Sequence, residues 1–318
     1  MIYIEVRANS PLVISSRHFV SNENNTLDYI PGSAFRGAIA EKLLMEIGPD
    51  DSGFKKIFIE GEIKFGNLYP LEGGQGFPTP KSAKTCKYLK GFPDQSHGHG
   101  VFDWLLPTVK YKITKDITAL PEICAICGAP IDNFTGFHIE QKMTEVTKRL
   151  ITRTAINEST LTAKDKFLYS LEVIEEEQKF WGIINVQPST LESGELEFQN
   201  ISILKEGELF WVGSGKTRGL GSIMIEKVEK IETILAEEFI PGNLENRFNR
   251  MQEKLSALNI NGFSINLYSD AIVIDKFMRY KSTIDENYLM EEFGMKDIKL
   301  VCAFNSTKEE SGWNAAWG

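Results

Sequence analysis

The sequence lacks any apolar run that approaches the roughly 18 residues of a membrane-spanning helix. Nothing at its start is typical of a signal peptide, because Glu5 and Arg7 interrupt the first apolar stretch. Cysteine is scarce, with four residues in 318, so these residues are more typical of thiols or metal ligands than of a disulfide framework. Together these absences predict a cytoplasmic protein with no membrane partner.

An excess of positive charge is lacking as well. The formal net charge is −9, which argues against a protein that coats nucleic acid over its whole surface but permits a local basic groove. Apolar residues make up 42% and charged residues 25% of the chain, which is ordinary for a globular protein. A chain of this length can form two domains with a sizeable core.

Residues 209–228 are predicted to form a strand, a glycine-rich loop and a second strand. Four glycines fall within nine residues of this loop: Gly213, Gly215, Gly219 and Gly221. Glycine permits positive φ angles and lets a ligand approach the backbone closely. Lys216 and Arg218 lie among the glycines, and free N–H groups beside two cations are suited to binding an anion, above all a phosphate.

The spacing of this loop excludes a nucleotide-binding P-loop. Such a loop requires Gly-x-x-x-x-Gly-Lys-[Ser/Thr], and Phe210 stands where the first glycine should be. A helix should follow it, whereas residues 222–228 alternate as a strand does. Ile223 and Ile225 are predicted to lie on one face of that strand and Val228 on the other. A hairpin loop that contacts nothing is the remaining alternative.

The first residues predict a strand with one buried face, because Ile2, Ile4 and Val6 alternate with polar neighbours. A similar pattern recurs at residues 265–274, which suggests two copies of one α/β unit. The predicted boundaries are 1–228 for the first domain, 229–261 for a helical connector, and 262–318 for the start of an incomplete second domain.

A helix is predicted after a Pro-Gly turn signal, with Ser33 as its N-cap. Apolar residues then recur at every fourth position from Phe35 to Ile47. Arg36 falls in the first turn, where a cation is electrostatically disfavoured unless an anion lies nearby. A bound phosphate would explain this position, and a solvated arginine is the alternative.

Residues 81–115 are rich in lysine and aromatic residues. The lysines are Lys81, Lys84, Lys87, Lys90, Lys110, Lys112 and Lys115, and the aromatic residues between them include Tyr88, Phe92, Phe102 and Trp104. Cations with interleaved aromatic rings suit the backbone and bases of a nucleic acid. The alternative is a solvated cationic face whose aromatic residues lie in the core.

The same region contains a metal-binding signal. Cys124 and Cys127 form a Cys-x-x-Cys knuckle, and Cys86 lies upstream of it. A third cysteine and a histidine make a Cys₃His zinc site the predicted chemistry, with His99 as the fourth ligand and His97 as the alternative. Four protein ligands would leave no open position, so the zinc would be structural and would not activate water. A redox dithiol is the alternative, although no thioredoxin-like pattern surrounds it.

Residues 141–172 are cationic and rich in threonine, a composition that favours turns and extended chain over a helix. Residues 168–174 then alternate, 175–177 form an acidic turn, and 180–186 have the pattern of another strand. We interpret these two strands as a hairpin that is approached by a cationic, protruding loop.

These motifs together resemble the RAMP superfamily of CRISPR effector proteins. Three segments carry the resemblance: Tyr-Ile-Pro-Gly-Ser-x-x-Arg-Gly at 29–37, Gly-x-Gly-Lys-x-Arg-Gly-x-Gly at 213–221, and Arg-Thr-Ala-Ile-Asn at 153–157. In the family they correspond to the start of the first helix, a glycine-rich loop and the start of a thumb hairpin. The cysteine–histidine region at 86–128 and Ser-Gly-Trp-Asn at 311–314 are similar to the large group-5-type subunit of type III-D complexes.

The resemblance implies an α+β fold of ferredoxin-like (RRM-like) RAMP domains, with a zinc-binding insertion at about 80–130 and a thumb at about 140–185. It also implies a non-catalytic subunit of a type III RNA-guided complex that binds and caps the 5′ repeat-derived tag of the CRISPR guide RNA. Such a subunit contacts the large signature subunit and the backbone RAMP subunits, and target RNA only indirectly. The implied RNA contacts are Ser33, Arg36, Arg149, Arg153, Gly215, Lys216 and Arg218.

An endoribonuclease is the main alternative, since some RAMP proteins cut CRISPR precursor RNA. His18 would be its acid–base residue, although no clear partner accompanies it in the sequence. Cleavage of target RNA would instead need an aspartate in an early loop, and Asp28 is the candidate. A zinc-stapled adaptor without RNA is the third possibility, but it leaves the cations of residues 81–115 and 213–221 without a role.

Overall fold

The computed structural model describes residues 1–15, 23–49, 51–93, 97–156, 159–160, 162–186, 197–198, 201–202, 204–231, 244–294 and 296–307. His18, Asn157 and the segment 311–314 lie outside these ranges. The chain forms two compact units: unit 1 comprises Met1–Pro78, Gly136–Leu255 and Asn261–Phe263, and unit 2 comprises Thr79–Thr135, Ser256–Ile260 and Ser264–Gly318. Within the described ranges, no helix combines the length and apolarity needed to cross a membrane.

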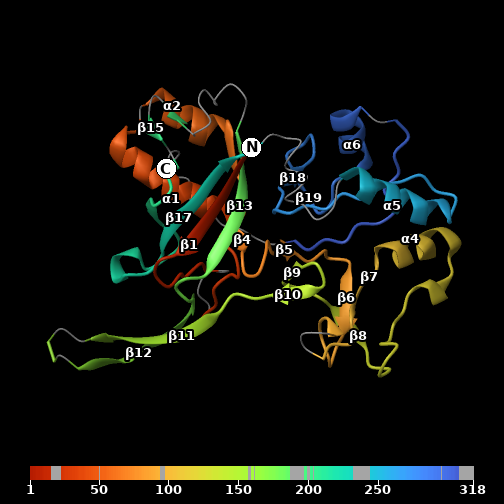
Figure 1. Cartoon of the computed structure of the whole chain (residues 1–318), viewed down its shortest axis with the longest axis horizontal. Coiled ribbons are helices and arrows are strands. Elements are labelled where there is room, and N and C mark those ends of the chain that lie inside the picture. Colours follow the sequence, from red (N-terminus) through yellow and green to blue (C-terminus); the bar gives the residue numbers. More distant parts are fainter. Residues whose placement is uncertain are drawn as a thin grey trace. The chain divides into compact units, whose positions relative to one another are not determined.

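A six-stranded sheet forms the centre of unit 1 (Figure 1). Hydrogen-bonded neighbours follow the order β16–β17–β1–β13–β3, and β4 also pairs with β13. The strands are β1 Ile2–Ala8, β3 Ile63–Phe65, β4 Tyr69–Pro70, β13 Lys179–Val186, β16 Leu209–Trp211 and β17 Ser222–Lys230. The predicted first strand and the predicted strand–loop–strand at 209–228 are therefore confirmed.

Helix α1, Gly32–Glu46, supplies one side of the core. Phe35, Ile39 and Leu43 are buried at helical spacing and join the core side chains of β1 in one cluster, which confirms the predicted helix. The short helix α2, Ser52–Lys55, and the π-helical turn η1, Lys56–Glu60, follow.

The predicted N-cap of α1 is wrong. Pro31 occupies the cap position with φ −59° and ψ 140°, and Ser33 lies inside the first turn. The Asn67 side chain takes over the capping function, because its Oδ1 accepts the Gly32 N–H at 2.8 Å. This acceptor comes from a residue 35 positions away, so the local sequence around Ser33 could not reveal it.

The prediction that Val228 lies on the opposite face of its strand from Ile223 and Ile225 is also wrong. The register between β1 and β17 shifts at one point, so that Val6 lies opposite Ile225 while Ile4 lies opposite Val228. The extra residue between them, Glu226, forms a β-bulge that interrupts the simple alternation. Val228 therefore packs against the same core as Ile225.

A long two-stranded arm is formed by β11, Lys148–Ile156, and β12, Ala163–Ile174 (Figure 1). The strands are antiparallel, and the short strand β2, Glu23–Asn24, pairs with β12 in parallel. The predicted hairpin between 168–174 and 180–186 is wrong, because β12 pairs with β11 while β13 pairs with β1. A turn that joins two strands in sequence does not oblige them to pair.

A smaller sheet and an aromatic cluster complete the main structure of unit 1. The sheet has the order β10–β9–β5, from Lys142–Thr144, Phe137–Ile139 and Phe77–Pro78. The ring of Trp181 on β13 lies 5.0 Å from Phe77 and 6.1 Å from Tyr3, measured between centroids. Tyr3 and Trp181 are only 2% and 4% exposed, so these aromatic rings belong to the interior.

Unit 2 contains a three-stranded sheet with the order β7–β6–β8. Its described elements are β6 Ala83–Cys86, β7 Val101–Asp103, α4 Leu105–Thr114, η2 Ile117–Ala119, β8 Ile131–Asn133, β18 Val273–Ile274, β19 Tyr280–Lys281 and α6 Glu286–Phe293. The remaining elements, in unit 1 or spanning both, are β14 Glu197–Phe198, β15 Ile201–Ser202, η4 Lys216–Arg218 and α5 Leu244–Ser256. Helix α5 confirms helical structure in the described part of the predicted connector.

The strand predicted at the start of the repeat, near residues 265–267, is not formed. Residues 261–272 are all described and contain no strand, and Ile265 and Leu267 are 47% and 56% exposed. A strand needs a neighbour that accepts its hydrogen bonds, and alternation alone does not supply one.

Candidate metal centre and nucleic-acid interface

Four side chains of unit 2 converge at the end of β6. The ligand atoms of Cys86, His99, Cys124 and Cys127 all lie within 4.8 Å of one another. The Sγ atoms of Cys86 and Cys127 are 3.6 Å apart, and the Sγ atom of Cys124 is 3.4 Å from Nδ1 of His99. Zinc–sulfur bonds of 2.3 Å in a tetrahedron place two sulfur atoms about 3.8 Å apart, so the arrangement fits a tetrahedral ion.

Backbone N–H groups support the thiols of this cluster. Those of Leu89 and Tyr88 lower the pKa of the Cys86 thiol below its usual range. Those of Cys127 and Ile126 act in the same way on the pKa of Cys124. At Cys86 and Cys124 the N–H groups favour the thiolate, which is the form that binds a metal. At Cys127 a hydrogen bond with the Ala129 backbone lowers the pKa, but burial and the neighbouring thiols raise it overall.

The structure separates the two candidate histidines. His99 belongs to the group that could hold a metal, whereas His97 does not. Because all four predicted ligands come together although they are spread over 42 residues of sequence, the region could bind a metal ion.

The glycine-rich loop between β16 and β17 has the predicted positive φ angles, from 72° to 89°, at Gly213, Gly215, Gly219 and Gly221. The fold requires glycine at position 213, because a Cβ atom there would lie 2.1 Å from the carbonyl oxygen of Val13. At Gly219 a Cβ atom would meet nothing within 4 Å. The loop is therefore packed tightly on one side and open on the other.

The backbone at the tip of this loop has converging N–H groups. Gly215 is left-handed, with φ 81° and ψ 19°, and the right-handed turn η4 follows it. Such a pair of conformations directs successive N–H groups into one concavity that suits an anion. Those of Gly215, Lys216 and Thr217 donate to no acceptor in the parts of the chain that the structure describes.

The two cations of the loop have partners within unit 1. The Lys216 ammonium forms an ion pair with Glu41 on α1. The Arg218 Nη1 atom donates a hydrogen bond to the Tyr169 hydroxyl on β12 at 3.0 Å. The Arg218 side chain uses one donor in this bond, and a guanidinium has five, so it can bind a further acceptor.

An apolar cluster joins the glycine-rich loop to the root of the β11–β12 arm. Val13, Leu171, Val173 and Leu220 are buried together, with Ile151 and Tyr169 packed against them. Arg153 lies directly opposite Tyr169 in the antiparallel register, so the two side chains share this face of the arm. Tyr169 thus neighbours both arginines: Arg218 through its hydroxyl and Arg153 across the strand pair. The structure records no ion pair of Arg153 with the described part of the chain.

The other arginine of the arm, Arg149, is closer to the acidic turn. Its guanidinium lies 3.1 Å from Glu176 and 3.9 Å from Glu175. Both carboxylates belong to the turn that follows β12, and they offset its charge. Of the two predicted RNA contacts on the arm, Arg153 is therefore the one whose charge is less compensated.

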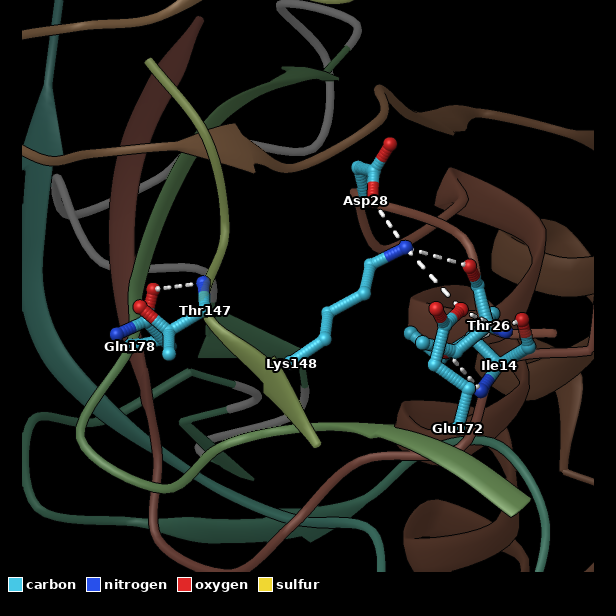
Figure 2. A network of polar contacts seen from close by, with 7 residues as sticks. All are labelled: Ile14, Thr26, Asp28, Thr147, Lys148, Glu172 and Gln178. Carbon is cyan, nitrogen blue, oxygen red and sulfur yellow. Dashed lines mark hydrogen bonds and ion pairs between the residues drawn. The ribbon is translucent and has the colours of Figure 1, made fainter. Parts of the chain in front are cut away.

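Lys148, at the first position of β11, anchors the root of the arm (Figure 2). Its ammonium donates to the Thr26 carbonyl at 3.0 Å and to Glu172 at 3.3 Å, and it pairs with Asp28. Glu172 also accepts the Thr26 N–H at 3.0 Å. The lysine side chain is 22% exposed, so this network fixes the arm to residues 26–28.

The residues predicted at the start of the first helix are exposed. Arg36 donates to the Phe58 carbonyl, and its guanidinium carbon lies 5.6 Å above the Phe58 ring. Ser33 lies one turn ahead of it on α1. The Arg36 side chain therefore packs against η1 and still reaches solvent.

The lysine-rich segment 81–115 matches its prediction only in part. Its described lysines are exposed or half-buried, and Tyr88 is 73% exposed. Phe92 packs edge-on against Phe134 at 5.7 Å, and the Lys84 ammonium lies 4.8 Å from the Trp104 ring. Phe92 and Trp104 thus have contacts within unit 2, as the alternative interpretation supposed, whereas Tyr88 faces solvent.

The sequence model of the RAMP superfamily matches residues 5–224. The chain belongs to the RAMP superfamily. The match includes the helix start, the arm and the glycine-rich loop, and it ends inside β17. No curated protein matches this RAMP chain.

Several solved structures are similar to the RAMP chain at low identity. A chain of "Type III-B Cmr-beta Cryo-EM structure of the Apo state" has 13% identity and a TM-score of 0.39, covering 71% of this chain and 96% of that one. Oligomeric Cmr4 from Pyrococcus furiosus has 12% identity and a TM-score of 0.32, with 73% and 98% covered. A chain of the "Type IV-B CRISPR Complex" has 11% identity and a TM-score of 0.33, with 79% and 98% covered. Likeness at this level carries no argument about what the RAMP chain does.

Sequence patterns did not single out Tyr169 or Glu41. Tyr169 falls in an alternating stretch where a tyrosine is ordinary, and Glu41 is one of two acidic residues on α1, with no motif around it. Only the register of the arm and the packing of the loop bring them to the predicted RNA contacts. The pairing of Arg153 with Tyr169 would have followed from the correct strand partner of β12.

Proposed function

We propose that this RAMP protein is a non-catalytic subunit of a type III CRISPR RNA-guided effector complex, in which it binds and caps the 5′ repeat-derived tag of the guide RNA. The observation that carries the proposal is the contact between Arg218 and Tyr169, which joins the glycine-rich loop to the arm. Membership of the RAMP superfamily supports it. So do the motifs at 29–37, 153–157 and 213–221, which resemble the RNA-contacting segments of such subunits.

The proposed RNA contacts are Ser33, Arg36, Arg149, Arg153, Gly215, Lys216 and Arg218. An RNA strand that is held by its phosphates needs cations and free N–H groups more than it needs base readout. The convergent N–H groups at Gly215 and the guanidinium of Arg153 offer both kinds of donor on unit 1. In this role the β11–β12 arm is the thumb that folds over the guide.

The sheet order of unit 1 supports a ferredoxin-like (RRM-like) domain. In chain order the four strands of the run β17–β1–β13–β3 are β1, β3, β13 and β17. The run places the first and third at its centre and the second and fourth on the outside, as a β-α-β-β-α-β fold does. We propose residues 1–228 as this first RAMP domain, residues 229–261 as a connector, and residues 262–318 as the start of a second one. The large signature subunit and the backbone RAMP subunits are its proposed partners, and target RNA is contacted only indirectly.

We also propose that Cys86, His99, Cys124 and Cys127 bind a structural zinc ion. The support is a set of four soft ligands at tetrahedral spacing, with no position left for water. Such an ion would stabilise the small sheet of β6, β7 and β8, whose Cys86 is itself a strand residue.

The contacts of the described residues favour a non-catalytic role. Asp28, the candidate for target cleavage, forms an ion pair with Lys148 and belongs to the anchor of the arm. Burial lowers the pKa of His138, whose Nδ1 atom lies 3.2 Å from the Glu140 carbonyl. His18 stays the candidate of the endoribonuclease alternative.

The first test is the RNA content of the protein purified from its host. We expect a bound RNA of fixed length, and an adaptor would carry none. Replacing Arg153 and Arg218 with Gln should weaken RNA binding and reduce its salt dependence by about one unit of slope per residue removed. Arg279→Gln, which removes an exposed arginine of unit 2, is the matched control.

A second assay addresses catalysis directly. The wild-type chain and His18→Ala should both leave a precursor RNA uncut while binding it equally well. Cleavage by the wild-type chain that is lost in His18→Ala, with binding intact, would replace the capping role with that of an endoribonuclease.

A further inference from the structure

Tyr169 on β12 contacts both the apolar cluster at the root of the arm and the glycine-rich loop. One side of its ring packs against the buried cluster of Val13, Leu171, Val173 and Leu220. Its hydroxyl accepts the hydrogen bond from Arg218 at 3.0 Å. The residue is nevertheless partly exposed. The ring is therefore held at its inner side and at its tip, and part of it still faces solvent.

Two arginines neighbour the ring of Tyr169. Arg153 lies directly across the β11–β12 pair from Tyr169, and Arg218 holds the hydroxyl from the glycine-rich loop. Opposite residues of an antiparallel pair have side chains close together on the same face. An aromatic ring held beside two arginines suits single-stranded nucleic acid, because phosphates can meet the cations while a base stacks on the ring.

We propose that Tyr169 is the platform on which one nucleobase of the bound RNA stacks. The inference rests on the proposed RNA-binding function and adds a specific contact to it: a base contact in a site otherwise made of phosphate contacts. Stacking needs only the π-face that every base has, so this contact fixes the position of a nucleotide with little demand on its identity. The bond from Arg218 serves to keep the ring in place.

The test uses the full chain and short single-stranded RNAs in which 2-aminopurine replaces one base at a time. Stacking on a tyrosine should quench the fluorescence at one position of the bound RNA. In Tyr169→Leu, which keeps an apolar side chain against the buried cluster, the quenching should disappear and the dissociation constant should rise about 5- to 150-fold. Tyr280→Leu is the matched control, because Tyr280 is 84% exposed and belongs to unit 2.

Tyr169→Phe separates the ring from its hydroxyl. It should keep the quenching and most of the affinity, because the stacking surface remains. A loss in Tyr169→Phe as large as in Tyr169→Leu would assign the effect to the hydrogen bond with Arg218 and overturn the stacking platform. Thermal unfolding of both variants shows whether the apolar cluster is intact.

Two further outcomes separate this inference from the function on which it rests. Should the wild-type chain bind no RNA under any condition, the proposed function fails and the platform with it. Should it bind RNA with no quenched position, or should Tyr169→Leu bind and quench as the wild type does, only the platform is overturned.

Discussion

The glycine-rich loop of unit 1 and the loops of unit 2 that surround Cys86 and Cys124, here called the cysteine loops, both have backbone N–H groups that point toward one place. In the first, the N–H groups of Gly215, Lys216 and Thr217 converge and donate to nothing in the described part of the chain. In the second, the N–H groups of Leu89 and Tyr88 point at the sulfur of Cys86. Converging N–H groups favour negative charge in both cases.

The two kinds of loop differ in the source of the negative charge. The cysteine loops carry a group that can become the anion, since the N–H groups favour the thiolate form of Cys86, and the four side chains could hold a metal ion. The glycine-rich loop has no side chain there, so an anion bound by it would have to come from elsewhere, and Lys216 and Arg218 raise the local positive potential. The side chains that such a turn carries thus decide whether it suits a metal or an external anion.

The largest effect should follow from removing the metal ligands. Replacing Cys124 and Cys127 with Ser should release about one zinc per chain, and structural zinc contributes on the order of 10 kcal/mol to the folding of zinc fingers. We expect faster amide exchange in β6, β7 and β8 and unchanged exchange in β1 and β13. Metal analysis and hydrogen exchange measure both quantities.

The matched control for that experiment is Cys302→Ser, because Cys302 lies outside the cluster of four. It should retain the full metal content. A double cysteine variant that keeps its zinc, or a Cys302 variant that loses it, would contradict the proposed zinc ligands.

A smaller effect is expected for the glycines of the loop, and two of them form a matched pair. Gly213→Ala places a Cβ atom against the Val13 carbonyl and also forces a positive φ on alanine. Gly219→Ala meets only the strain of φ, which costs about 1–2 kcal/mol. The free energy of unfolding, measured in urea, should therefore fall further in Gly213→Ala. Equal losses of unfolding free energy at both positions would mean that the close approach to the Val13 carbonyl does not affect stability.

The smallest effect concerns the charge of the loop. Glu41→Gln removes the carboxylate that pairs with Lys216, and an exposed pair of this kind contributes only about 0–1 kcal/mol to stability. We expect nearly unchanged stability, tighter binding of single-stranded RNA by a few-fold, and a steeper dependence of that binding on salt. Glu46→Gln, at the end of the same helix, is the control. Weaker RNA binding in Glu41→Gln would mean that the pair orients Lys216 for the ligand.

The fold also explains why RNA contacts are expected on loops and not on the sheet. An RRM uses aromatic residues of its sheet to stack bases. Two aromatic rings of the sheet, Tyr3 and Trp181, are buried and stack on one another, and Trp181 also packs against Phe77. Tyr169, on the arm, is partly exposed and neighbours two arginines, so the proposed base contact falls on the arm and not on the sheet.

Much of the fold could be predicted from short stretches of sequence. The helix through Phe35 and Leu43, the strand at Ile2–Ala8 and the four positive φ angles of the loop depend on residues only a few positions apart. The four side chains that could hold a metal were also predicted, since the Cys-x-x-Cys spacing is local and the remaining cysteines and histidines offered few alternatives. Which histidine joins the cluster was decided by the fold.

The errors have a common physical origin. The predicted hairpin failed because β12 pairs with β11 and not with the strand that follows it. The predicted face of Val228 was wrong because a bulge at Glu226 shifted the register of β17 against β1. The cap at Ser33 failed because Asn67 supplies the acceptor. In each case a residue distant in sequence competed with the local pattern.

The sequence by itself determined which segments are helical or extended, where the backbone needs glycine, and which residue types could bind a metal or a phosphate. These properties arise from the conformational preferences and spacing of neighbouring residues. Only the tertiary structure decided which strands pair, which carboxylate faces Lys216, and that Arg153, Tyr169 and Arg218 meet at one place. Such contacts form between residues far apart in the chain, where packing and hydrogen-bond satisfaction select one arrangement among many that the local pattern allows.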